Sequence, residues 1–66
     1  MKNKLKVHRA IKDVTQAKLA EAIGVSRQTI NAIEKNKYVP STVLALKLAQ
    51  FFEVKVEEVF ELSDED

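Results

Sequence analysis

Residues 15–34, TQAKLAEAIGVSRQTINAIE, contain the most informative pattern in the chain. Its small and aliphatic residues follow the pattern Ala-x3-Gly-x5-Ile-x2-Ile, which is formed by Ala20, Gly24, Ile30 and Ile33. The small alanine lets a second helix cross closely, and the glycine accepts the positive φ of a sharp reversal at no steric cost. The two isoleucines, three residues apart, mark the buried face of the second helix. The pattern therefore predicts two short helices that cross at roughly 90–120°.

Outside this stretch, apolar residues also recur mostly at intervals of three and four. With breaks at Gly24, at the loop 36–40 and at the polar ends, this periodicity predicts five helices. Their expected ranges are about 3–12, 16–23, 27–35, 42–52 and, for a very short fifth helix, 56–60. No strand signal is strong, although residues 60–62 could pair briefly with the N-terminal segment.

Residues at the helix ends support these boundaries. Asp13 is expected to end the first helix in a left-handed conformation, which aspartate tolerates better than most residues do. Gly24 is expected to end the second helix in the same way. Serine or threonine stands directly before each of the next three helices as an N-cap. These caps are Thr15, Ser26 and Ser41.

The composition limits the possible functions. The chain has 66 residues, 45% hydrophobic and 32% charged, which is typical of one small soluble domain. Because it has no Cys and only one His, we expect no disulfide, no metal site, no cofactor and no small-molecule ligand. An enzyme is not expected either, since no nucleophile with its base and no glycine-rich phosphate loop can be assembled. The longest apolar run, 43–46, is far shorter than the roughly 18 residues of a membrane helix, so a cytoplasmic protein is expected.

The charge is distributed unevenly along the chain. Residues 1–52 carry ten Lys and Arg against three acidic residues, whereas residues 53–66 carry one Lys against seven acidic residues. A basic body suits a polyanion partner, because Lys and Arg release counterions from a phosphate backbone. A solvated surface with a solubilising tail explains the same charges equally well. Composition does not decide between these two interpretations.

Polar side chains occupy the expected outer face of the second helix of the pair. Arg27, Gln28 and Asn31 lie on its N-terminal half, which in a helix-turn-helix enters the major groove of DNA. Arginine can bind guanine O6 and N7 bidentately, and glutamine or asparagine can pair with adenine N6 and N7. Alone, such residues are more often a solvated helix face. The adjoining Ala-Gly-Ile-Ile scaffold favours the DNA-binding interpretation.

The run 15–34, followed by Lys-Tyr-Val-Pro-Ser at 37–41, resembles the phage repressor and Cro-like (Xre-type) helix-turn-helix family. The resemblance covers about residues 3–60. It implies an all-α, five-helix lambda-repressor-like domain at 1–60, with the helix-turn-helix at helices 2 and 3, followed by an acidic tail at 61–66. It also implies a stand-alone transcription regulator, with repression as the expected mode, that binds an inverted-repeat operator in double-stranded DNA as a homodimer.

The resemblance implies roles for individual positions. Base contacts are implied for Ser26, Arg27, Gln28 and Asn31. Phosphate contacts, which set register without reading sequence, are implied for Gln16, Thr29, Lys35, Lys37 and Tyr38. The lysines could instead be ordinary surface charge, and the tyrosine could cover the edge of the core. Arg9 and Glu34 match the family's ion pair between helix 1 and helix 3, which orients the recognition helix.

The sequence departs from the family pattern on its first helix. Val7 and Ile11 stand where charged residues are common and form a second apolar stripe. This stripe is either additional self-association surface or the sign of a slightly shifted helix.

The C-terminal segment carries more apolar residues than so small a core easily buries. We therefore expect part of it to meet the same patch of a second subunit. The expected dimer residues are Phe51, Val56, Phe60 and Leu62. The alternative is that this segment folds back on its own body.

Two other functions are compatible with the same fold. One is a DNA-binding antitoxin that also captures a toxin protein, which a co-purifying small protein would indicate. The other is a protein-interaction adaptor, for which replacing Arg27 or Gln28 would leave partner binding unchanged.

Overall fold

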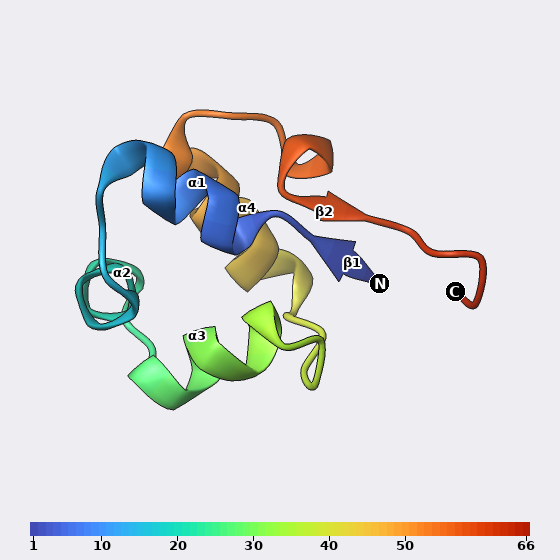
Figure 1. Cartoon of the computed structure of the whole chain (residues 1–66), viewed down its shortest axis with the longest axis horizontal. Helices are drawn as coiled ribbons and strands as arrows, with labels where there is room; N and C mark the ends of the chain where they lie inside the picture. Colours follow the sequence, from blue (N-terminus) through green and yellow to red (C-terminus); the bar gives the residue numbers. More distant parts are fainter.

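A computed structural model describes all residues, 1–66, and consists mainly of four α-helices (Figure 1). The helices are α1 (Leu5–Lys12), α2 (Gln16–Ile23), α3 (Arg27–Glu34) and α4 (Thr42–Phe52). A 3-10 turn, η1 (Val56–Glu58), and two short strands, β1 (Lys2–Asn3) and β2 (Phe60–Glu61), complete the chain. None of the helices has both the length and the apolar character that a membrane-spanning segment requires.

Three helices begin at the side-chain caps that the sequence predicts. The hydroxyl oxygen of Thr15 accepts a hydrogen bond from the Lys18 backbone N–H at 3.0 Å. The Ser26 and Ser41 hydroxyls accept equivalent bonds, each at 3.1 Å, from the third residue that follows. Each bond satisfies one of the backbone donors that a helix start leaves unpaired, so α2, α3 and α4 start where the sequence places them.

The turn between α2 and α3 depends on the backbone conformation of Gly24. Its φ is +88°, and a Cβ atom added there would meet no other heavy atom within 4 Å. The glycine is therefore required for its dihedral angle and not for a close approach. Asp13 ends α1 in the left-handed conformation as predicted, with a φ of 56°.

The core lies between the helices and is closed by the C-terminal segment. Every α-helix contributes to it, and Val59 and Phe60 add buried side chains after η1. Its fully buried side chains are Leu5, Leu19, Ile30, Ile33, Leu48 and Val59. Ala20 is also buried, as close helix crossing requires. In Figure 1, α2 is seen nearly end-on while α3 runs across the view, so the two helices cross steeply.

The prediction of five α-helices is wrong at both ends of the chain. Lys2 and Asn3 form a strand that pairs antiparallel with Glu61 and Phe60, so α1 begins at Leu5 and not at residue 3. The expected fifth helix is a single 3-10 turn, because the side chain of Val59 is buried in the core and the backbone enters the sheet at Phe60. The weak strand signal at residues 60–62 is thus confirmed for Phe60 and Glu61.

Candidate nucleic-acid interface

The outward face of α3 is entirely polar. A hollow of about 270 Å³ lies on it and is lined by Arg27, Gln28, Asn31 and Lys35, without any apolar side chain. Arg27, Gln28 and Lys35 are exposed, and Asn31 is half-buried. The opposite face of the same helix holds Ile30 and Ile33, which are buried. Helix α3 lies along one side of the molecule, and its N-terminal half points away from β1 and β2 (Figure 1).

The N-terminal end of α3 is closed by two hydroxyl groups. Ser26 Oγ accepts from the Thr29 backbone N–H at 3.1 Å and lies 2.9 Å from Thr29 Oγ1. Ser26 is exposed and Thr29 is half-buried. Ser26 therefore caps α3 and Thr29 lies in its first turn. Ser26 also lies at the edge of the polar face of α3.

An ion pair joins α1 to the last residue of α3. Arg9 Nε donates to Glu34 Oε2 at 2.6 Å, and Arg9 Nη2 donates to Glu34 Oε1 at 3.1 Å. The third guanidinium nitrogen, Nη1, donates to the backbone carbonyl of Val14 at 3.0 Å. Arginine presents its donors in a rigid planar fork. The pair therefore fixes the orientation of α3 relative to α1.

The ion pair changes the protonation of both partners. Burial raises the pKa of Glu34, but hydrogen bonds from Arg9 and Gln16 and the attraction of the guanidinium outweigh it, so the pKa lies below its ordinary value. The hydrogen bond to Glu34 raises the pKa of Arg9, although burial opposes this. Glu34 therefore carries its charge at neutral pH.

Gln16 is turned toward α3 and not into solvent. Its side-chain amide nitrogen Nε2 donates to Glu34 Oε1 at 3.0 Å and to Asn31 Oδ1 at 3.2 Å. Both N–H donors of this amide, which the family resemblance assigns to a phosphate, are thus used within the chain. The sequence analysis missed this contact, because residues 15 positions apart meet only once the two helices have crossed.

The loop after α3 is held by a residue that the sequence analysis did not select. Asn3 Nδ2 donates to the backbone carbonyl of Ile33 at 2.8 Å and to Asn36 Oδ1 at 3.0 Å. Asn3 Oδ1 also accepts from the Leu5 backbone N–H at 3.1 Å. Lys37 and Tyr38 follow in this loop and are exposed. Asn3 thus fixes the segment that presents both of them.

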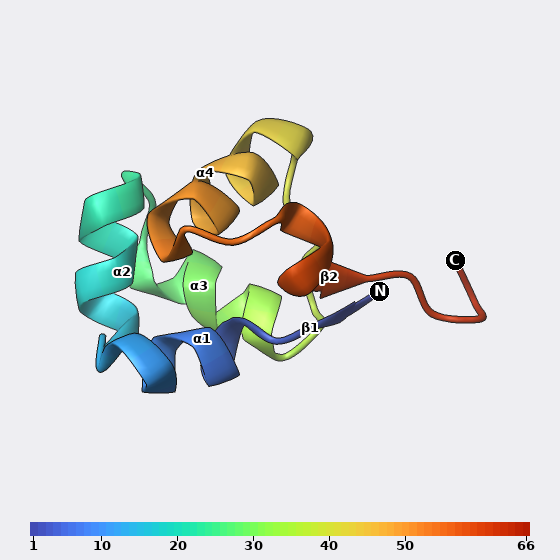
Figure 2. The same cartoon turned by 90° about the horizontal axis from the view of Figure 1, so that it is seen from above.

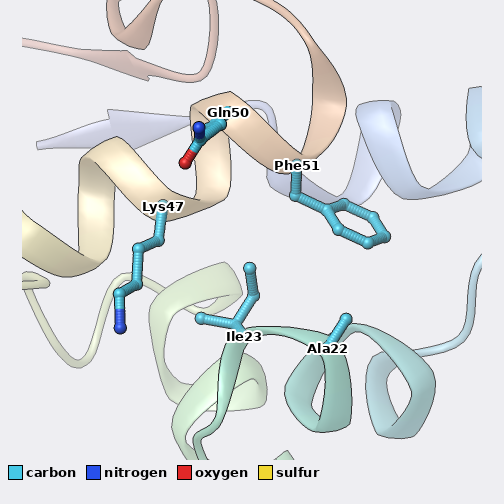
Figure 3. Close-up of a pocket in the computed structure, with 5 residues that line it drawn as sticks. All are labelled: Ala22, Ile23, Lys47, Gln50 and Phe51. Carbon is cyan, nitrogen blue, oxygen red and sulfur yellow. The ribbon is translucent and has the colours of Figure 1, made fainter.

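The expected dimer residues differ in what they expose. Phe60 is buried in the core of its own chain, and Phe51 and Val56 are half-buried, whereas Leu62 is 75% exposed. Phe51 packs edge-on against Phe52, with ring centroids 5.1 Å apart. It also borders an open hollow of about 380 Å³ that Ala22 and Ile23 of α2 face across from α4 (Figure 3). Part of the C-terminal segment thus folds back on its own body.

The apolar stripe on α1 remains on the surface. Val7 is 54% and Ile11 is 75% exposed, whereas Leu5 and His8 of the same helix face the core and Phe52. Figure 2 shows α1 at the edge of the molecule that lies opposite α4. Helix α1 is therefore not rotated to bury the stripe, which leaves it as free apolar surface.

Comparison with known proteins agrees with this geometry. A helix-turn-helix family model matches residues 5–59. An uncharacterised HTH-type transcriptional regulator of Methanocaldococcus jannaschii is 58% identical, and another, YgzD of Bacillus subtilis, is 53% identical. Both alignments cover all of this chain and all of the relative.

Two solved structures share the fold. The restriction-modification controller protein C.AhdI from Aeromonas hydrophila superposes with a TM-score of 0.78 and 30% identity, over 85% of each chain. A putative DNA-binding protein from Bacteroides fragilis superposes with a TM-score of 0.80 and 34% identity, over 88% of this chain and 94% of its own. The chain belongs to the helix-turn-helix family of DNA-binding transcriptional regulators, which is not a family of enzymes.

Proposed function

We propose that this protein binds an inverted-repeat operator in double-stranded DNA as a homodimer and represses transcription from it. The observation that carries the proposal is the polar hollow on α3, where Arg27, Gln28 and Asn31 meet on the face opposite the buried isoleucines. A helix presented in this way fits the major groove, which is about 12 Å wide. Because the target is chromosomal DNA, we place the protein in the cytoplasm.

Within this proposal, the polar residues fall into two groups. Arg27, Gln28, Asn31 and the adjoining Ser26 contact base edges. Lys35, Lys37 and Tyr38, which are exposed at and after the end of α3, hold the phosphate backbone together with Thr29. Contacts of the second kind set the register of the protein on DNA without reading its sequence. Repression follows by steric occlusion, because a regulator that is bound to its operator blocks the access of other proteins to this DNA without a further domain or ligand.

The homodimer is supported by apolar surface that the single chain leaves uncovered. Leu62 and the rim of the hollow beside Phe51 offer such surface, whereas Phe60 supports the contact from within the core. In a twofold dimer the same patch faces itself. Two recognition helices would then contact half-sites centred about 10–10.5 bp apart.

The proposal is tested by selecting bound DNA from a randomised pool and footprinting the selected sites. We expect an inverted repeat with half-sites one helical turn apart. Arg27→Ala should relax the preference at one base pair by about 1–3 kcal/mol. Lys37→Ala should instead weaken binding to all sequences equally and lower the salt dependence by about one counterion.

The matched control is Lys55→Ala, which removes an exposed lysine from the segment before η1, far along the chain from α3. Its binding should equal that of the wild type. A pool with no enriched sequence, or equal losses in all three variants, would overturn the proposed function. Sedimentation of Leu62→Lys, which should shift the protein toward monomer, tests the dimer separately.

A further inference from the structure

A continuous line of hydrogen bonds runs from α1 to the polar hollow on α3. It starts at Arg9, passes through Glu34 and the side-chain amide of Gln16, and ends at Asn31. Glu34 is nearly covered, with 7% of its side chain exposed. Asn31 lines the hollow with Arg27, Gln28 and Lys35. The line therefore connects a covered charge to a residue on the proposed DNA-binding face.

The chemistry of the first two residues sets the direction of every bond that follows. Arginine has only donors, and an ionised carboxylate has only acceptors. Glu34 receives two bonds from Arg9, so the group that approaches its Oε1 from the other side must also donate. The amide of Gln16 consequently turns its NH₂ group toward Glu34, at 3.0 Å.

The same reasoning fixes the orientation of the Asn31 side-chain amide. The NH₂ group of Gln16 has two hydrogens, and the second points to Asn31 at 3.2 Å. That position on Asn31 must accept, so it is occupied by Oδ1 and the Nδ2 group lies on the other side. Asn31 Nδ2 has no hydrogen-bond partner within the chain. It is left free to donate to a ligand in the hollow.

We propose that Gln16 is a positioning residue that presents Asn31 to DNA as a hydrogen-bond donor, so that Asn31 reads guanine in preference to adenine. This inference rests on the proposed function and deepens it by naming the base. The guanine edge in the major groove carries two acceptors, O6 and N7. The two hydrogens of Nδ2 match these acceptors.

The usual pairing of asparagine with adenine is disfavoured here. It needs Oδ1 on the base side to accept from adenine N6 while Nδ2 donates to N7. Turning the Asn31 amide over would bring two NH₂ groups face to face and break its bond to Gln16. Turning both amides would bring the Gln16 carbonyl against the Glu34 carboxylate, which cannot donate to it. Neither arrangement keeps the line of hydrogen bonds intact.

The experiment compares base preferences of four proteins in the same randomised-pool selection: wild type, Gln16→Met, Asn31→Ala and the double variant. Methionine keeps the length of the side chain and removes its donors. The base pair that Asn31 reads is the one whose preference disappears in Asn31→Ala. We expect the wild type to prefer guanine there by about tenfold. Gln16→Met should reduce this preference to about twofold or less, and adding it to Asn31→Ala should change nothing further.

The preference that Arg27 sets serves as an internal control, because it should remain unchanged in Gln16→Met. A chemical control replaces the guanine by 7-deazaguanine, which lacks N7. The wild type should lose affinity for this DNA, whereas Asn31→Ala should bind it as well as it binds guanine. This second measurement needs no change at Gln16, so it tests the contact of Asn31 with guanine N7 even if Gln16→Met fails to fold, and its failure would overturn the inference.

The outcomes separate this inference from the proposed function. Enriched operators whose base preferences are the same in wild type and Gln16→Met would overturn the inference and leave the regulator intact. The same holds if the wild type prefers adenine at that base pair, or if Gln16→Met weakens all sequences equally, as loss of a phosphate contact would. Absence of any enriched sequence would overturn both.

Discussion

The molecule has two ion pairs, and they differ in what surrounds them. Arg9 and Glu34 join α1 to α3 across a covered contact, with 15% and 7% of their side chains exposed and an Nε–Oε2 distance of 2.6 Å. The N-terminal amine of Met1 meets Asp66 at 3.1 Å nearer the surface, with 21% and 30% of their side chains exposed. The first pair has further hydrogen bonds to Val14 and Gln16, whereas the Asp66 carboxylate has its other bonds to nearby Ser63.

The contribution of an ion pair to the stability of the fold therefore depends on its burial and on the hydrogen bonds that it shares with other groups, and not on the presence of two charges alone. An exposed pair gains little, because water and salt screen it and two flexible ends must be ordered. A covered pair that loses one partner leaves a charge without compensation. The two pairs therefore predict very different responses to substitution.

The largest effect is expected for Arg9→Ala. It leaves Glu34 covered and without its cation, which should lower the free energy of unfolding by about 3 kcal/mol. Urea denaturation followed by circular dichroism measures this loss. Arg9→Lys, which keeps the charge but not the planar fork, should recover only part of it. Full recovery by lysine would show that the fork geometry is unimportant.

The next largest effect is the dependence of stability on pH. Because the pKa of Glu34 is lower in the folded chain than its ordinary value of 4.5, ionised Glu34 stabilises the fold above that value. This contribution is lost as the pH falls below about 4.5 and through the folded pKa. Urea titrations of wild type and Glu34→Gln between neutral and acidic pH test the sign: the two stabilities should converge on acidification. A gap that widens toward low pH would contradict the assignment.

A smaller effect is expected for Asn3→Ala. The substitution removes bonds to the Leu5 backbone N–H, the Ile33 carbonyl and Asn36. Loss of these bonds should lower the free energy of unfolding by about 1–2 kcal/mol. Hydrogen exchange should show faster opening of the last turn of α3, with Lys2→Ala as the control that leaves these bonds in place. Unchanged exchange there would mean that Asn3 does not hold the loop.

The smallest effect is expected for Asp66→Asn. Hydrogen bonds from Ser63 and from the N-terminal amine lower the pKa of Asp66, but the group lies on the surface. Its pair with Met1 should therefore add nothing measurable, and the urea midpoint should stay at the wild-type value in low and high salt. A clear loss of stability at low salt would remove the contrast between the two ion pairs.

The elements with strong local signals could be predicted from the sequence. Three capped helix starts and the Gly24 turn depend on residues that are neighbours in the chain, so local rules apply to them. The sequence predicts the two ends only in part. It indicates a brief pairing of residues 60–62 with the N-terminal segment, but it places the start of α1 at residue 3, because no local pattern near residue 3 shows that Asn3 leaves the helical path to pair with Phe60.

The residues of the candidate site differ in the same way, because local sequence rules predict the positions of some of them and not of others. The outward placement of Arg27 and Gln28 follows from helical periodicity, because Ile30 and Ile33 define the buried face. The inward turn of Gln16 does not follow from periodicity. It depends on how α2 crosses α3 and on the charge of Glu34, which Arg9 maintains from a third helix.

The empty space around Gly24 has a consequence for which sequences this fold accepts. The position demands a positive φ but leaves room for a side chain. The residues tolerated there should therefore be those that adopt a positive φ most readily, whatever the volume of their side chains. The chain already holds Asp13, Asn36 and Glu53 at φ values between 56° and 59°. A library randomised at codon 24 should therefore return asparagine ahead of the smaller alanine, and β-branched residues last.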